Sequence, residues 1–432
     1  MSETRQPFPS WHLLGSQAHS IETRHGHADG AKHHKGKLDS QSIILLLVHG
    51  LFSIANALSG TFVNVYIWKA KSDFALIGWF ALIQQLTMAI TFWVAGKWVK
   101  EHNKMNSLRA GIALSAVFYL MVLWLGQGAV TYIWLLGIVQ GMASGCFWLA
   151  FNVVYFEVTD PDNRDQFNGW AGIIGSSSGI LTPWLSGYFI AKMGDSGGYR
   201  FIFSLSLVIF FVGVIVSFFL KKRKVSGTYY WIQAIKDLRR KNNPWRLVVP
   251  ALSAQGIREG VFGFIIGLLV YIATKKELQL GNFTLITSAV AFVSFLLLGR
   301  WLKRRYRGPA MLLGTVMMSA VILPLFWKLN YFTLLIFGIG TALFMPLYTI
   351  PMTSSVFDLI GGNAETAQAR VEYIVLRELA LCGGRVVGTL VFIIVVSQTT
   401  SPFIMNILLL CIGSAPIATW ILMRGCLAPR KG

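Results

Sequence analysis

Long apolar runs alternate with short charged or Gly- and Pro-rich breaks along most of the chain. From residue 43 onward these runs are about 20 residues long or longer, the length an α-helix needs to cross the hydrocarbon core of a bilayer. Lipid cannot satisfy exposed backbone polar groups, so such runs predict transmembrane helices. We therefore predict an all-α membrane protein with twelve spans. The predicted spans are 43–68, 74–98, 108–126, 130–156, 167–192, 200–220, 247–273, 281–299, 310–327, 331–357, 373–397 and 402–423.

The breaks between these runs divide the chain into five parts. Residues 1–42 are polar, contain no apolar run typical of a signal peptide, and predict a disordered tail. Two six-span halves, 43–220 and 247–423, are joined by a basic linker over 221–246, and 424–432 form a second short tail.

The tail over 1–42 holds most of the chain's eight histidines. A metal-binding tail is one interpretation of them, and a solvated tail without metal is the other. The tail has no cysteine and no ordered spacing of ligands, which favours the second interpretation. We expect neither a metal site nor a cofactor.

Composition agrees with a membrane protein. The 432 residues are 54% hydrophobic and only 13% charged, against about 25% charged residues in soluble domains. A net charge of +20 could indicate nucleic-acid binding. However, the charges occur in short clusters between apolar runs, so we expect no nucleic-acid partner.

The distribution of Lys and Arg predicts the orientation. Most of these residues fall in the tails, the linker and the breaks that lie on the same side as the linker. Cytoplasmic loops carry such an excess, which places both termini and the linker in the cytoplasm of a multi-pass cell-membrane protein.

The linker also carries aromatic residues among its basic ones, including Tyr229, Tyr230 and Trp231. This pattern suggests an amphipathic helix on the inner leaflet, with a regulatory lipid switch as its functional version. A plain linker anchored by its positive charge is the favoured alternative.

An internal repeat relates the two halves. Residues 77–111 align without gaps to residues 280–314, and the match includes Gly, Trp and Lys residues in the break after the second span of each half. Both halves have six spans and start on the same side. The repeat is therefore predicted to be parallel, with a pseudo-two-fold axis along the membrane normal relating two six-helix bundles.

At these breaks the chain resembles the major facilitator superfamily. The segments 96–104 and 299–307 look like that family's signature loops after the second helix of each half, with an opening glycine and trailing basic residues. The family's usual acid at the fifth position is replaced by lysine in both loops, which departs from the pattern of its customary gating salt bridge. The gating-loop residues are Gly96, Lys100, Lys104, Gly299, Lys303 and Arg307.

Further segments add to the resemblance. Arg164 precedes the fifth span, residues 199–203 open the sixth, and 370–388 resembles a poorly characterised bacterial subgroup. The resemblance covers nearly everything after residue 42. It implies two bundles that rock about a central site in the lipid bilayer, a small-molecule substrate and coupling to protons, and we expect a monomer.

Small residues recur every four positions in two spans, which lets helix backbones approach closely. Both sets are predicted to be packing ridges. They are Gly137, Gly141 and Gly145 in the fourth span, and Gly175, Gly179, Pro183 and Gly187 in the fifth.

Ionisable residues within spans are costly and are therefore functional candidates. They gather in the second half, whereas the first half offers polar residues. Interhelix salt bridges that hold or gate the bundle are the alternative to direct substrate or proton binding. The substrate and coupling candidates are Arg258, Glu259, Arg377, Glu378, Arg385, Asn56 and Asn152.

Among these, Glu259 is the predicted coupling residue, because its seventh-span position lies near mid-membrane. Burial there disfavours the carboxylate and a facing arginine favours it, so movement of one helix could switch its protonation. Arg385 is the predicted counter-ion and Glu378 the alternative coupling residue. His49, near the inner end of the first span, is expected to be hydrated and ordinary. Because arginines outnumber acids, Arg258 or Arg385 is a candidate for meeting an anionic group of the substrate.

The sequence contains no ATP-binding loop, since Gly96-Lys97 is followed by Trp98 rather than by Ser or Thr. Transport is therefore predicted to run on a gradient. The preferred function is proton-coupled secondary transport of a small solute, with efflux slightly favoured. Import of a small organic anion is the alternative. A membrane-embedded enzyme or sensor is the rival from another class, but no clustered nucleophile, metal site or receiver domain supports it, so we predict no enzyme.

Overall fold

The structure is a computed structural model that describes residues 38–159, 164–221, 227–240, 243–302, 304–360, 368–399 and 401–427. Within these residues the chain is almost wholly helical and forms no β-strand. Eleven of its helices are long and apolar enough to cross a membrane. This confirms the predicted all-α membrane protein.

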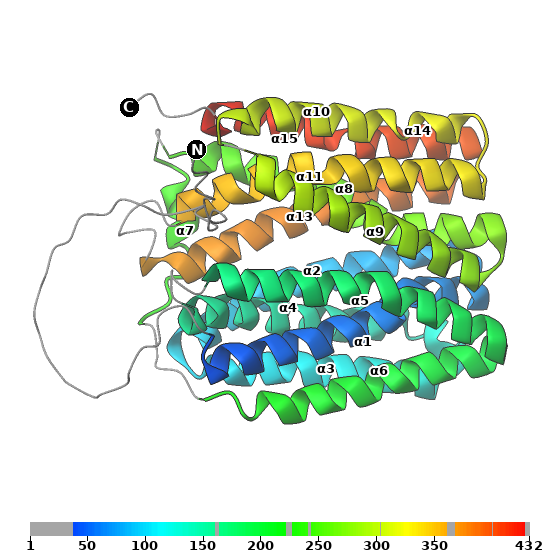
Figure 1. The fold of residues 1–432 in the computed structure, drawn as a ribbon, viewed down its shortest axis with the longest axis horizontal. Coiled ribbons are helices and arrows are strands. Elements are labelled where there is room, and N and C mark those ends of the chain that lie inside the picture. Colours follow the sequence, from blue (N-terminus) through cyan, green and yellow to red (C-terminus); the bar gives the residue numbers. More distant parts are fainter. Residues whose placement is uncertain are drawn as a thin grey trace, which may run out of the picture.

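The helices run back and forth along one direction of the molecule (Figure 1). The first half contains α1 (Ser40–Ala70), α2 (Phe74–Glu101), α3 (Lys104–Leu125), η1 (Gly126–Val130), α4 (Ile133–Val158), α5 (Arg164–Met193) and α6 (Asp195–Ser217). The linker contains α7 (Gln233–Asp237). The second half contains α8 (Trp245–Thr274), α9 (Glu277–Trp301), η2 (Arg304–Tyr306), α10 (Arg307–Ala320), η3 (Leu323–Phe326), α11 (Tyr331–Ile360), α13 (Arg370–Gln398), α14 (Pro402–Gly413) and α15 (Ala415–Leu427).

Eleven of the twelve predicted spans match helices that satisfy both length and composition. The remaining one is α5, which has 30 residues and is long enough. Its middle is rich in Gly and Ser, including Gly172, Gly175 and the run 176–178, so it is less apolar than the others. The twelfth span therefore stays a prediction.

Short polar breaks start several helices by capping them. Asp39 accepts a hydrogen bond from the amide of Ser42, and Asp73 accepts from the amides of Ala75 and Leu76. Such caps satisfy backbone N–H groups that have no partner within the helix. The charged breaks in the sequence thus mark the helix starts closely.

The helices of each half pack mainly on one another, and the halves meet through two long pairings, α2 with α13 and α5 with α9. In Figure 1 the first half lies below the second. We call the end that holds Ser40, α7 and Leu427 the linker end, and the other the opposite end.

Glycines at repeat-equivalent positions make equivalent contacts. A methyl group on Gly111 of α3 would lie 2.5 Å from the backbone nitrogen of Phe147 on α4. One on Gly314 of α10 would lie 2.9 Å from that of Tyr348 on α11. In both halves the third helix therefore touches the fourth at a glycine, at positions that differ by the repeat offset.

The predicted ridge on α4 packs as expected, because Gly137, Gly141 and Gly145 all lie against α2. The prediction of a packing ridge on α5 is correct only in part. A methyl group on Gly187 would lie 2.7 Å from the carbonyl oxygen of Glu277 on α9, whereas Gly175 and Gly179 face open space.

The linker differs from the amphipathic helix that its composition suggested. In the part of the linker that the structure describes, helix is limited to the five residues of α7. Tyr229 is buried, and the Trp231 ring packs against Trp93 of α2. These aromatic side chains are directed at protein, so this part of the linker binds the helix ends.

Candidate functional site

The two helices that carry most of the candidate charges, α8 and α13, lie unusually close. Gly384 of α13 faces the carbonyl oxygen of Ser253 on α8, and Gly256 and Gly260 of α8 face the α13 backbone in the same way. Small residues at these positions allow the backbones to touch. The close approach brings polar side chains of both helices together near mid-height.

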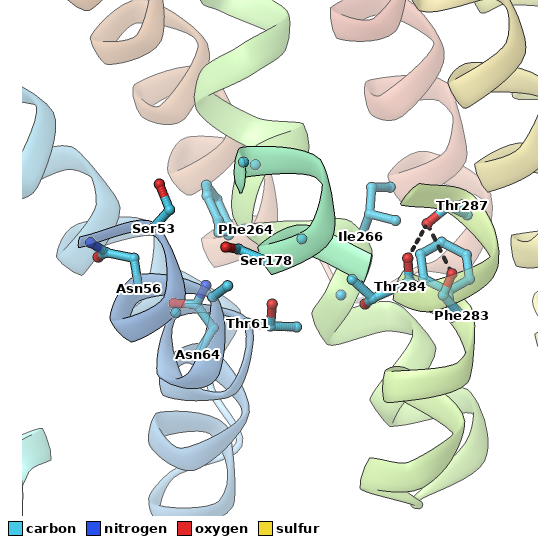
Figure 2. Close-up of a pocket in the computed structure, with 16 residues that line it drawn as sticks. Ser53, Asn56, Thr61, Asn64, Ser178, Phe264, Ile266, Phe283, Thr284 and Thr287 are labelled. Carbon is cyan, nitrogen blue, oxygen red and sulfur yellow. Dashed lines mark hydrogen bonds between the residues drawn. The ribbon is translucent and has the colours of Figure 1, made fainter. Parts of the chain in front are cut away.

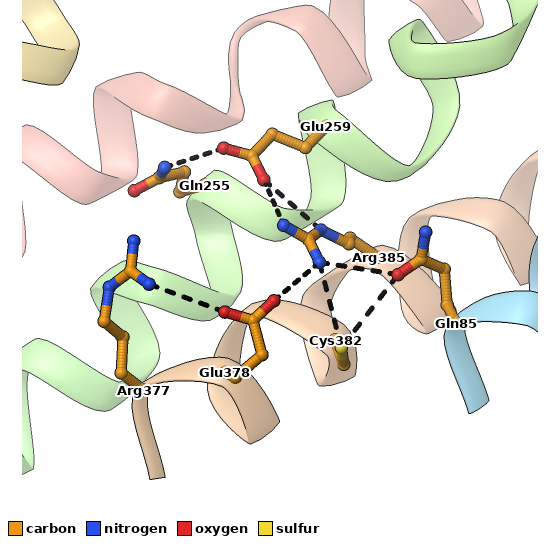
Figure 3. Close-up of polar contacts among 7 residues, drawn as sticks. All are labelled: Gln85, Gln255, Glu259, Arg377, Glu378, Cys382 and Arg385. Atoms are coloured by element: carbon orange, nitrogen blue, oxygen red, sulfur yellow. Dashed lines mark hydrogen bonds and ion pairs between the residues drawn. The ribbon is translucent and has the colours of Figure 1, made fainter. Parts of the chain in front are cut away.

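Arg385 of α13 is the centre of this charge cluster (Figure 3). Its Nη2 lies 2.9 Å from Oε2 of Glu259, and its Nη1 lies 3.0 Å from Oε1 of Glu378. Nη1 of Arg377 lies 3.4 Å from the other oxygen of Glu378. The expected pairing of Arg385 with Glu259 is therefore present, and the four side chains together carry no net charge.

Two glutamines complete the cluster: Gln85, one of the polar candidates of the first half, and Gln255, which the sequence had not indicated. Gln255 donates from Nε2 to Oε1 of Glu259 at 2.7 Å. Gln85 of α2 accepts from Nη1 of Arg385 at 3.4 Å, which links the cluster to the first half. The four-residue spacing of Gln255 and Glu259 could have indicated the first contact. The second joins residues 300 positions apart, for which the sequence gives no signal.

Arg258 points elsewhere. It is buried, and its guanidinium carbon lies 4.7 Å from the centre of the Phe262 ring. Its Nε and Nη2 have no hydrogen-bond partner within the described ranges. Adjacent residues on a helix point about 100° apart, which explains why the Arg258 and Glu259 side chains lie in different surroundings.

A cavity of about 540 Å³ lies between the halves (Figure 2). It is lined by segments of α1 and α5 from the first half and of α8 and α9 from the second. Its lining residues are Ser53, Asn56, Ala57, Gly60, Thr61, Asn64, Gly175, Ser178, Gly179, Gly263, Phe264, Ile266, Gly267, Phe283, Thr284 and Thr287.

The cavity and the charge cluster are neighbours along α8. Glu259 lies four residues before Gly263, on the same face of the helix and about 6 Å away along its axis. The Glu259 side chain is 31% exposed, so its carboxylate is the most accessible acid of the cluster. Gly175 and Gly179 of α5, which were predicted to pack, line this cavity instead.

The polar candidate residues of the first half lie in different places. Asn56 lines the cavity, and its Nδ2 donates to the carbonyl oxygen of Phe52 at 2.9 Å. Asn152 of α4 is half-buried and does not line this cavity. His49 was expected to be hydrated, but it is buried and stacks on Phe151, because α1 packs there against α4.

At the linker end an ion pair joins the halves. Lys100, at the end of α2, pairs with Glu372 at the start of α13, and both side chains are buried. Glu372 also accepts a hydrogen bond from the amide of Tyr230 in the linker at 3.2 Å. The lysine that departs from the family pattern thus still makes a salt bridge, with the acid on the other half.

The linker also packs against the end of α2 beside this ion pair. The amide of Tyr229 donates to Oε1 of Glu101 at 2.9 Å, and its hydroxyl oxygen would lie 2.7 Å from a methyl group on Gly96. Burial, with a smaller contribution from the Glu372 carboxylate, raises the pKa of Tyr229, which keeps the phenol neutral. Gly96 therefore makes room for a linker side chain, whereas Gly299 has open space around its position.

The remaining gating-loop residues form a repeated pair within each half. Lys104 at the start of α3 pairs with Glu157 at the end of α4. Nη1 of Arg307 at the start of α10 lies 3.0 Å from Oδ2 of Asp358 near the end of α11. Lys303 lies outside the described residues.

A second ion pair joins the halves at the opposite end. Lys69 of α1 pairs with Glu277 at the start of α9. The hydroxyl of Tyr199 on α6 donates to the same carboxylate at 3.3 Å. Among the residues that the structure describes, each end of the interface between the halves therefore carries a cross-half salt bridge.

Over the described ranges, no group of three or more His, Cys, Asp or Glu side chains could hold a metal ion. The histidines of the tail lie outside those ranges.

Comparison with known proteins agrees with this architecture. The model of a protein family described as "Major Facilitator Superfamily" matches residues 45–369. A protein of Bacillus subtilis (strain 168), "Uncharacterized protein YqgE", is 40% identical over 355 residues, which are 82% of each chain. A Geobacillus stearothermophilus protein, "Uncharacterized protein in sodM 3'region", is 39% identical over 161 residues, or 37% of this chain and 75% of that one.

Solved structures show the same fold. A crystal structure of a D-xylose-proton symporter superposes with a TM-score of 0.65 at 14% identity, covering 90% of this chain and 97% of the other. A bacterial homologue of the iron transporter ferroportin, in its outward-facing state, superposes with a TM-score of 0.64 at 13% identity, covering 90% and 99%.

Proposed function

Because the chain belongs to the Major Facilitator Superfamily, we propose that it is a secondary active transporter that couples the movement of protons to that of a small solute by alternating access. The observation that carries the proposal is the position of Glu259. It is an ion-paired acid in the middle of the protein, one helical turn from a cavity between the halves.

Two cross-half ion pairs support alternating access. Lys100 with Glu372 holds the linker end, and Lys69 with Glu277 holds the opposite end. Opening a path from the cavity to either side requires the halves to part at that end, which breaks its pair. We infer that the two pairs are gates that open in turn.

The cluster suggests how a proton would couple to this motion. Arg385 stands on α13 between Glu259 and Glu378, and its Nη1 also contacts Gln85 of the first half. When the halves move, the contact to Gln85 changes, and Arg385 can shift from one acid to the other. A carboxylate that loses its guanidinium partner in a desolvated site binds a proton.

The proposal also includes twelve spans with α5 as the fifth, a parallel repeat of two bundles, a monomer, and a cytoplasmic location for both termini. The excess of Lys and Arg at the linker end supports that orientation. The contacts of Gly111 and Gly314, which differ by the repeat offset, support the repeat.

Proton coupling is testable with the full chain in liposomes that contain a pH-sensitive dye. A panel of uncharged polyols, organic carboxylates and amphipathic cations is added outside, and solute-dependent proton flux is recorded in both directions of the gradient. We expect Glu259→Gln to abolish uphill accumulation while solute exchange continues, because the neutral amide cannot carry the proton.

Glu378→Gln is the matched variant, since it removes the other acid of Arg385. We expect it to slow transport but to leave coupling intact. Loss of coupling in Glu378→Gln but not in Glu259→Gln would transfer the role to Glu378. Unchanged uphill transport in both variants would exclude the cluster from coupling.

Transport of a small organic anion is a second candidate, and one observation favours it. Arg258 is a buried guanidinium with two nitrogens that lack a partner in the described part of the chain. Arginine binds carboxylates well. Against it, Arg258 packs on Phe262 and is not among the residues that line the cavity.

A further inference from the structure

The cavity between the halves presents uncharged hydrogen-bonding groups. Its polar lining side chains are Ser, Thr and Asn only, and none of its lining residues is charged. We propose that the cavity binds a small, uncharged solute that carries several hydroxyl groups. This inference rests on the transporter function proposed above and assigns the substrate class of the same protein.

Several of the polar groups are available chiefly as acceptors. The hydroxyls of Ser178, Thr284 and Thr287 donate to backbone carbonyl oxygens of their own helices at 2.8, 3.0 and 2.9 Å. A hydroxyl has one hydrogen and two lone pairs, so each oxygen can still accept a hydrogen bond. Asn56 uses its Nδ2 on a carbonyl oxygen, which leaves its Oδ1 as an acceptor as well.

Two other side chains of the lining can both donate and accept. Asn64 and Thr61, one turn apart on α1, have no hydrogen-bond partner among the residues the structure describes (Figure 2). The cavity thus combines surplus acceptors with a smaller number of donors. A hydroxyl group does both, so a polyol can satisfy both kinds of site.

Charged solutes fit this lining less well. A carboxylate group has only acceptor atoms and would meet the oxygens of Ser178, Thr284 and Thr287 with no cation in the lining. A cation would leave water without a carboxylate in the lining to compensate its charge, which is costly. The charge cluster nearby is already neutral, since Arg385 is paired with both of its acids.

The remaining lining suits the carbon skeleton of such a solute. Phe264, Phe283 and Ile266 supply apolar surface, and Gly263 and Gly267 keep the α8 side open. The volume of about 540 Å³ falls in the range of about 300–1,000 Å³ typical of small-molecule sites.

The proposal is tested by equilibrium binding to the full chain in detergent, measured by titration calorimetry. The probes are xylitol, D-glucose and myo-inositol as uncharged polyols, benzoate and citrate as anions, and tetraphenylphosphonium as a cation. We expect saturable binding of at least one polyol and none of the charged probes. Asn64→Ala and Thr284→Val should each weaken that binding about threefold to tenfold, since each removes one or two hydrogen-bonding groups.

Thr349→Val is the matched control. Thr349 of α11 donates to a backbone carbonyl oxygen as Thr284 does, at 3.0 Å, but lies outside the cavity lining. Its substitution should leave the polyol dissociation constant unchanged. An equal loss in Thr349→Val and Thr284→Val would place the binding elsewhere and overturn the proposal.

Binding of a charged probe in preference to every polyol, or failure of all three polyols to bind, also overturns the proposed class. Either result leaves the transporter function standing if uphill flux in liposomes still depends on Glu259. Conversely, polyol binding that depends on Asn64, without uphill flux, would refute the coupled transporter and keep the class of ligand.

Discussion

A single side chain, Arg385, compensates two acids, the buried Glu378 and the half-buried Glu259, and part of this arrangement could be predicted from sequence. Glu259 and Arg385 stood out because ionisable residues near the middle of a span need partners, and few were available. The contact of Arg385 with Gln85 could not be predicted, since it depends on how the two halves dock. Of the cavity, Asn56 was a predicted candidate and does line it, whereas Ser and Thr residues such as Thr61 are unremarkable within a span.

Removing the Arg385 side chain should strongly destabilise the protein. Arg385→Ala leaves Glu259 and Glu378 without their shared partner, and breaking its pair with the buried Glu378 alone costs about 3–5 kcal/mol. We expect a clear fall in the unfolding temperature of the purified protein. Arg424→Ala, at an exposed position of α15, should leave that temperature within error. Equal unfolding temperatures for wild type and Arg385→Ala would mean that the cluster contributes nothing to stability.

The pair of Lys100 and Glu372 should tolerate exchange of its charges but not the loss of one. Lys100→Glu places two carboxylates together in a buried position and should destabilise the protein by about 3 kcal/mol or more. The double variant Lys100→Glu/Glu372→Lys should recover most of that loss in a thermal unfolding assay. Lys97→Glu is the control, because Lys97 is largely exposed and its pair with Glu101 is worth at most about 1 kcal/mol. A double variant no more stable than Lys100→Glu would show that the pairing is not what matters.

At the scale of elements, the spacing of small residues predicted a ridge on α4 correctly and one on α5 only in part. Both helices repeat glycine every four residues, and sequence alone cannot distinguish a glycine against a neighbour from one against a cavity. Gly141 lies against α2, whereas Gly175 and Gly179 line the space between the halves. The amphipathic helix suggested for the linker is not seen in its described part for a similar reason, since its aromatic residues could cover lipid or protein equally well.

The difference between the two kinds of glycine gives a direct test. A methyl group on Gly141 would lie 2.5 Å from the carbonyl oxygen of Gln84, so Gly141→Ala should destabilise by about 1–3 kcal/mol. Gly172 of α5 has nothing within 4 Å, and Gly172→Ala should stabilise by up to about 1 kcal/mol through helix propensity. Both are measured by thermal unfolding. The same sign for both variants would contradict the packing described for α4.

At the scale of the whole molecule, the internal repeat was the most informative feature of the sequence. Its offset relates Lys104 to Arg307, and each of these two residues pairs with an acid near the end of the fourth helix of its own half, Glu157 or Asp358. A repeat can be recognised in a sequence because both copies must keep residues that allow the same helix packing. The asymmetry between the halves, with its charges in the second, is also visible in sequence. How the halves close on one another is not, because each half could dock in more than one way.

The proposed orientation can be tested by labelling with a membrane-impermeant thiol reagent. In a background lacking Cys411 and Cys426, we expect Gln233→Cys in α7 to react only from the cytoplasmic side. Lys328→Cys, in the exposed turn at the opposite end, should react only from outside. Reaction of Gln233→Cys from outside would invert the topology.

The Gly- and Ser-rich composition of α5 also bears on how the chain is synthesised. A nascent helix enters lipid from the translocon according to its apolar content, and Leu, Ile, Phe or Val each contribute only about −0.3 to −0.6 kcal/mol. With Gly172, Gly175 and three serines in its middle, α5 has little of this driving force. It packs against α1, which is made before it, and against α9, which is made after it. We therefore expect α5 to be retained first by α1 and fully secured only when the second half has emerged, so that an interrupted chain ending near residue 220 would be a substrate for membrane quality control.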